Sequence, residues 1–167
     1  GLARARGARR IVKGKSMTTE EIGLNPALEA LGAEVVETDL GEFVVQLARE
    51  APSHIIVPAI HRTQEDIADL FHERLAAPRC DSAEALTKVA RERLREVFRT
   101  ADMGVTGANF AVAETGTLVI VENEGNARLT TTVPRLHVAV VGIEKVVERL
   151  ADVVLDHDRP IHVPCDD

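Results

Sequence analysis

Residues 102–126, DMGVTGANFAVAETGTLVIVENEGN, contain two short apolar runs that are joined by a tight turn and followed by a polar loop. The runs, Val105–Val112 and Thr117–Val121, are rich in β-branched residues and bounded by turn residues, as strands are. Glu114, Thr115 and Gly116 connect them. The stretch therefore predicts two strands that form a hairpin-like, antiparallel pair.

The ends of these predicted strands carry glycines and an unusual density of polar side chains: Asp102, Thr106, Asn109, Glu114, Thr115, Asn123, Glu124 and Asn126. Glycine lets the backbone approach a ligand closely, and amides and carboxylates can orient one. Ordinary turns use the same residue types. Composition alone therefore supports two interpretations, a ligand site and a pair of plain turns.

Short apolar runs alternate with amphipathic segments through the rest of the chain. We expect further strands at 11–12, 34–37, 53–60 and 136–142, and helices at 40–50, 63–75, 82–99 and 143–155. A capping box from Thr18 to Glu21 and a second cap at Asn25 predict two helical turns near residues 18–31. This alternation predicts an α/β fold with a three-layer, mostly parallel open sheet and helices on both faces. The domain would span 1–155, followed by a divergent polar tail, 156–167, with a possible short strand at 161–163.

Composition restricts the functional classes. The net charge of −7 argues against a general nucleic-acid or anionic-membrane surface, and no apolar run approaches the roughly 20 residues of a membrane helix. The two cysteines, Cys80 and Cys165, form no C-x-x-C pair, so we expect neither a zinc site nor a cysteine-ligated cluster here. Free thiols and the lack of a signal-peptide pattern predict a cytoplasmic location.

Two lysines follow the first predicted strand. Gly14-Lys15-Ser16 has the ending of a P-loop, but position 9 is arginine where that motif needs glycine, and no glycine loop separates the strand from Lys13. Lys13 and Lys15 share a strand face and lie at its carboxyl end, where open α/β sheets bind ligands. We expect them, with Ser16, to anchor a carboxylate or phosphate, although solvated lysines would give the same pattern.

Four longer segments resemble the LUD domain of lactate utilization protein B. They are KGKSMTTEEIGLNPALEALG (13–32), VVETDLGEFVVQLA (35–48), PSHIIVPAIH (52–61) and ADMGVTGANFAVAETGTLVIVENEGNARLTTTVPRLHVAVVGIEKVV (101–147). The resemblance implies a sheet like that of the NagB/ribose-phosphate isomerase/CoA-transferase group. It also implies a bacterial role in oxidising L-lactate to pyruvate with other lactate-utilization subunits. In the full-length family member 4Fe-4S clusters are expected in a ferredoxin-like region, which this sequence lacks.

The resemblance assigns no catalytic residues, so the candidates rest on position and chemistry. A lactate site needs a cation for the carboxylate and a base near the hydroxyl. The candidate bases are Glu114, Glu124, His61 and His137. The candidate substrate-binding residues are Lys13, Lys15, Ser16, Thr106, Asn109, Thr115, Asn123 and Asn126.

Two other functions are compatible with the sequence. In an isomerase- or CoA-transferase-type enzyme, Glu114 or Glu124 would be the nucleophile. In a non-catalytic scaffold, the domain would dock partner subunits. A homo-oligomer is compatible with each function.

Overall fold

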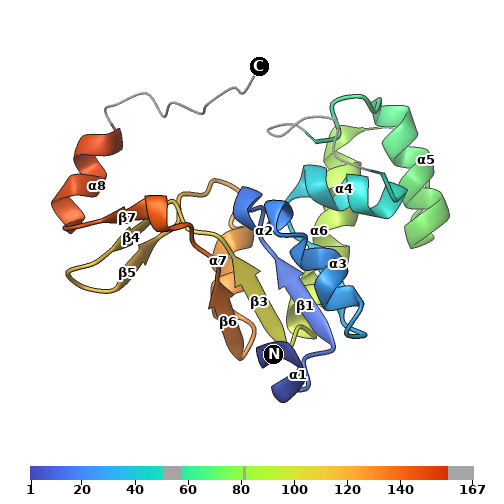
Figure 1. Cartoon of the computed structure of the whole chain (residues 1–167). Helices are drawn as coiled ribbons and strands as arrows, with labels where there is room; N and C mark the ends of the chain where they lie inside the picture. The colour runs from blue at the N-terminus through green and yellow to red at the C-terminus, as the bar shows by residue number, and fades with distance from the viewer. Residues whose placement is uncertain (51–57, 81, 158–167) are drawn as a thin grey trace.

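The centre of the molecule is a four-stranded, all-parallel sheet. The computed structural model describes residues 1–50, 58–80 and 82–157, and only the backbone for the last four of these (Figure 1). The strand order is β2-β1-β3-β6. The bounds are β1 Arg10–Lys13, β2 Glu34–Glu37, β3 Met103–Thr106 and β6 Leu136–Ala139. The predicted, mostly parallel α/β architecture is confirmed.

Helices cover both faces of this sheet because its strands are apolar on both sides. Ile11, Val35 and Val105 face α1 (Leu2–Ala5) and α3 (Leu24–Glu29). Val12 and Val36 face the opposite way, into a core with α4 (Leu40–Ala48), α5 (Gln64–Leu75) and α6 (Ala83–Arg99). Strands that are buried on both faces read as continuous apolar runs, which is why the sequence predicted them.

Side-chain caps fix where most helices begin. Asp39 accepts the amide of Gly41 at the start of α4, Thr63 forms a capping box with Asp66 at α5, and Ser82 caps α6. These three starts match the predicted ones.

The predicted caps near residues 18–31 are wrong. Ser16 caps α2 (Met17–Glu21) by accepting the Thr19 amide, where the sequence suggested Thr18. Gly23, in a left-handed conformation, precedes α3, where the sequence suggested Asn25. The amide of Asn25 instead donates to Glu37 Oε1 at 2.6 Å, so a tertiary contact replaces the local cap.

Helix α7 (Asn126–Thr132) packs directly on β3. Gly104 makes this possible, since a Cβ at this position would fall on the carbonyl oxygen of Thr130. The fully buried Thr130 donates to the Asn126 carbonyl at 2.8 Å and lies 3.5 Å from Thr38 Oγ1. The close approach brings the start of α7 near the carboxyl ends of β1 and β3.

A second, three-stranded sheet projects from the first (Figure 1). Its order is β5-β4-β7, with β4 Phe110–Val112, β5 Thr117–Val119 and β7 Val146–Val147, and α8 (Leu150–His157) follows β7. β4 and β5 form the predicted antiparallel pair. We call these four elements, together with residues 107–109, 120–125 and 143–145 beside them, the arm.

Two sequence expectations fail in detail, and a third is tested only at its end. The run 105–112 is not one strand but is divided between β3 and β4, which belong to different sheets. The helix expected at 143–155 is a 3-10 turn, η1 (Ile143–Lys145), then β7, then α8. Of the strand expected at 53–60, residues 53–57 lie outside the described residues, and 58–60 form a turn. The strand suggested at 161–163 also lies outside them. No helix in the described part of the chain is long and apolar enough to cross a membrane.

Candidate functional site

A pocket lies where the carboxyl ends of β1 and β3 meet. From β1 the chain crosses one face of the sheet to β2, and from β2 it crosses the other face to β3, so these strand ends flank a topological switch point. Open α/β sheets bind ligands at such points. The cavity measures about 390 Å³ and lies between the main sheet and the arm. We call it the strand-end pocket.

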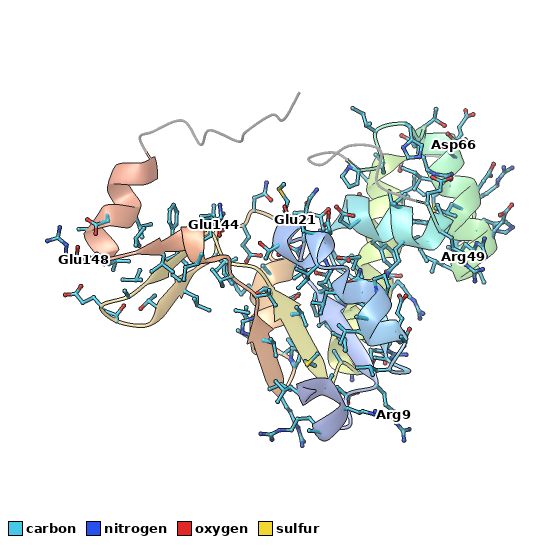
Figure 2. The ribbon with its side chains drawn as sticks, in the orientation of Figure 1. Arg9, Glu21, Arg49, Asp66, Glu144 and Glu148 are labelled. Atoms are coloured by element: carbon cyan, nitrogen blue, oxygen red, sulfur yellow. The ribbon has the colours of Figure 1, made fainter. Side chains whose placement is uncertain are left out.

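The strand-end pocket gathers most of the predicted substrate-binding residues. Its lining includes Lys15, Ser16, Thr106, Asn109, Asn123, Glu124 and Asn126. They come from the β1–α2 connection, the β3–β4 connection and the loop before α7. The first two connections start at neighbouring strand ends, which explains why residues about 90 positions apart share one cavity. In Figure 2, α2 with Glu21 and η1 with Glu144 lie at this end of the sheet.

Lys13 does not line the strand-end pocket. Its side chain is 1% exposed and forms a 3.0 Å ion pair with Glu37 Oε1 on the neighbouring strand. Burial raises the pKa of Glu37, while the ammonium of Lys13 opposes that shift. The pair lies beneath the surface next to α3.

Three other candidates lie elsewhere. Glu114 and Thr115 are exposed at the tip of the β4–β5 hairpin, where Thr115 Oγ1 lies 2.8 Å from Thr117 Oγ1. His61 lies past the end of α4 and contacts Glu50 Oε2 at 2.9 Å. None of the three belongs to the lining of the strand-end pocket.

His137 reaches the pocket only through a neighbour. Its Nε2 shares a 2.8 Å hydrogen bond with the hydroxyl of Thr106, which lines the pocket. Partial burial lowers the pKa of His137, so the neutral ring prevails at pH 7. A neutral imidazole at this distance can orient the Thr106 hydroxyl.

Two carboxylates meet at the start of α4, on the wall of the pocket. Asp39 Oδ1 accepts the amides of Gly41 and Glu42 at 3.2 and 3.5 Å. Partial burial, followed by the charge of Asp39, raises the pKa of Glu124, while the backbone N–H of Leu40 opposes this. A raised carboxyl pKa makes Glu124 a better proton acceptor at neutral pH.

Cations reach the pocket from two directions. Lys15 Nζ lies 3.3 Å from Glu42 Oε1 on α4, and Lys145 enters the lining from η1. Lys145 and Asp39 were not among the predicted site residues. Lys145 was missed because a helix was expected there, and Asp39 because its helix-capping signal masked its place beside Glu124.

Two close contacts fix the backbone around the pocket, one at Gly107 and one at Asn109. A Cβ on Gly107 would lie 2.8 Å from Ser16 Oγ, so a larger residue there would displace the side chain that caps α2. Asn109 Oδ1 accepts the Val121 amide at 2.7 Å and thereby joins the two loops that enter and leave the β4–β5 hairpin. These contacts fix the position of the arm's base relative to the main sheet.

The residues present do not fit an iron–sulfur cluster. Such clusters are commonly held by four cysteine thiolates, and the whole chain contains two cysteines. Cys80 lies near α5 and donates to the Pro78 carbonyl at 3.2 Å. Within the described residues, no group of three or more His, Cys, Asp or Glu side chains is arranged to hold a metal ion.

Comparisons with known proteins agree with the resemblance. Residues 3–158 match the model of the LUD domain. "Lactate utilization protein B" of Bacillus pumilus is 51% identical over 152 residues, which cover 90% of this chain and 32% of that protein. "Uncharacterized electron transport protein YkgF" of Escherichia coli is 49% identical over 152 residues, covering 91% and 32%. "Lactate utilization protein B" of Shouchella clausii is 51% identical over 141 residues, covering 84% and 30%.

The chain therefore spans about a third of the length of these relatives. No solved structure matches it. The family-model match over nearly the whole chain decides the assignment: this chain belongs to the LUD domain family.

Proposed function

We propose that the strand-end pocket binds L-lactate, and that the chain is the substrate-binding domain of a lactate-oxidising system. The observation that carries this proposal is the meeting of Lys15, the Asn109 and Asn126 side chains, and Glu124 in one cavity at the switch point. The names of the relatives, which refer to lactate utilization, support lactate as the substrate.

The pocket offers a partner for each group of lactate. The ammonium of Lys15, and that of Lys145 from the arm, would bind the carboxylate. The hydroxyl would donate to Glu124, which acts as the general base. The side-chain amides of Asn109 and Asn126 would fix the plane of the lactate carboxylate. That plane sets the direction of the C2–H bond.

Oxidation of L-lactate to pyruvate removes two protons and two electrons. Glu124 takes the hydroxyl proton, the C2–H bond breaks, and a carbonyl forms at C2. Two electrons and the second proton leave to an electron-transfer partner protein, which the proposal includes. The described residues bind and orient lactate and accept the first proton.

Calorimetry and thermal unfolding with L-lactate, D-lactate and pyruvate test the proposal. At a hundred times its Kd, a ligand stabilises the native state by roughly 2.7 kcal/mol, which a melt detects. We expect L-lactate or pyruvate to stabilise the protein, and Lys15→Ala to abolish the effect. Lys88→Ala is the matched control, because Lys88 is exposed on α6. A lactate response that Lys15→Ala leaves intact, or no response at all, contradicts the proposal.

A CoA-transferase-type enzyme is the second candidate, favoured by the position of Glu124, which lines the pocket and precedes Gly125 in the chain. Glu124 would attack the thioester carbonyl and release CoA as the thiol. Incubation with acyl-CoA followed by mass spectrometry would detect a covalent adduct on Glu124. Glu114, at the exposed hairpin tip, serves as the matched negative position.

A further inference from the structure

Among the charged residues that line the strand-end pocket, Lys145 alone forms no ion pair or side-chain hydrogen bond within the described part of the chain. It is exposed on η1. The other cation of the lining, Lys15, lies 3.3 Å from Glu42 Oε1, and the side chain of Glu42 is only 7% exposed. This buried carboxylate compensates the charge of Lys15, whereas the charge of Lys145 stays available to a ligand.

The carboxylates of the lining already have donors at the starts of helices. Asp39 accepts two backbone amides in the first turn of α4. Glu124 accepts the backbone N–H of Leu40 in the same turn. Glu122 accepts the amide of Arg128 on α7 at 3.1 Å, and its other oxygen lies 3.7 Å from Arg128 Nε. Each carboxylate thus has a donor other than Lys145, so the ammonium is left to an anion that enters the pocket.

Lys145 approaches the pocket from the arm, whereas much of the floor belongs to the main sheet. η1 leads directly into β7, which pairs with β4, so the position of Lys145 follows that of the arm. Glu144, its neighbour in η1, marks this place in Figure 2. Ser16 and Thr106 line the opposite side, at the ends of β1 and β3. An anion that contacts Lys145 and this floor therefore joins the two sheets.

The arm gains little stability from its own core. Val112 is the one buried hydrophobic residue among those of the arm that the structure describes. Regions of this kind open locally at a small cost in free energy. An open arm would carry Lys145 away from the floor and lose its contact with a bound anion. A ligand that binds only the closed arrangement lowers the population of the open one by the factor 1 + [L]/Kd.

From these observations we infer that Lys145 couples anion binding in the strand-end pocket to the stability of the arm: the bound carboxylate holds the arm against the main sheet through this one side chain. The inference rests on the proposed function, since the anion is lactate in the same pocket. It adds that the arm closes more firmly when substrate is bound.

Hydrogen-exchange mass spectrometry of the whole chain with L-lactate tests the inference. Peptides from 110–121 report on β4 and β5 and contain no substituted residue. At a hundred times its Kd, L-lactate should slow their exchange by up to about a hundredfold. L-Lactamide, which lacks the carboxylate, should leave it unchanged. Calorimetry on the same samples gives the Kd.

Lys145→Ala should abolish the slowing by L-lactate and weaken lactate binding by at least about tenfold, the usual effect of losing a charge-assisted hydrogen bond. Lys145→Arg keeps the cation and should retain both effects. Arg149→Ala is the matched control. Arg149 is also an exposed cation, next to β7, but it lies outside the lining and is paired with Asp152.

Three outcomes overturn the inference alone and leave the proposed lactate site in place. They are lactate binding without slower exchange in 110–121, slowing that Lys145→Ala leaves intact, and faster exchange of ligand-free Lys145→Ala. The last would mean that Lys145 holds the arm without a ligand. No lactate binding to the parent protein would overturn both the inference and the proposed function.

Discussion

At the scale of single residues, the fold is most sensitive to substitution at the buried Lys13–Glu37 ion pair. Both side chains are less than a tenth exposed, and they join β1 to β2 at 3.0 Å. Removing one partner of such a pair leaves an uncompensated buried charge and costs roughly 3–5 kcal/mol, whereas replacing both by apolar residues is often neutral. The interaction therefore sets a limit on what can be substituted here.

We predict that Lys13→Met lowers the free energy of unfolding by about 3–5 kcal/mol, and that Lys13→Met combined with Glu37→Leu recovers most of the loss. Urea unfolding monitored by circular dichroism measures both values. A single variant as stable as the parent, or a double variant no better than the single one, would show that the pair is not a coupled unit.

At the scale of elements, the contact between α7 and β3 depends on one glycine. A methyl group at Gly104 would meet the carbonyl oxygen of Thr130, and the backbone of a helix yields less easily than a side chain. We predict that Gly104→Ala lowers the free energy of unfolding, measured in urea, by at least about 1–3 kcal/mol. Gly14→Ala is the matched control, since its nearest contact would be Thr106 Cγ2 at an ordinary 3.6 Å. Equal losses in the two variants would contradict this account.

The elements that the sequence predicted well are those with local signals. Asp39, Thr63 and Ser82 cap their helices through contacts within three residues, which a sequence displays directly. The segment 143–155 has apolar residues at helical spacing, yet Val146 and Val147 pair with Ala111 and Val112. That pairing is non-local and overrides the local periodicity. The same reason explains the division of 105–112 between two sheets.

At the scale of the whole molecule, stability is unevenly distributed. β1 and β3 lie in the centre of the main sheet with Ile11, Val12 and Val105 at or below 1% exposure. In the arm, Val112 is the one buried hydrophobic residue among those described, while Leu118, Val146 and Leu150 are more than 40% exposed. Regions with few buried apolar contacts open more readily.

We therefore predict that amides of the arm exchange with deuterium faster than those of β1 and β3. Hydrogen-exchange mass spectrometry of peptides from 110–121 and 143–150, against peptides from 10–13 and 103–106, makes the comparison. Equal protection in the two regions would mean that the arm is stabilised as strongly as the main sheet.

The sequence predicted those site residues whose positions follow from the order of the strands. The carboxyl end of the first strand was expected to bind a ligand, and Thr106 and Asn109 were candidates as polar residues of the stretch 102–126; Lys15, Ser16, Thr106 and Asn109 share one cavity. Sequence position could not place Lys13 under the surface, because its burial depends on Glu37 from another strand. Nor could it bring in Lys145, which reaches the pocket only because β7 pairs with β4.

The strand-end pocket takes its floor from the main sheet and part of its wall from the arm, in a chain that contains neither tryptophan nor tyrosine. The protein therefore has almost no intrinsic fluorescence. An indole introduced at Val121, on that wall, would be the sole strong fluorophore, and its emission would shift as water enters between the floor and the wall. The scarcity of aromatic residues therefore makes the opening of the pocket an event that one fluorophore can follow without background.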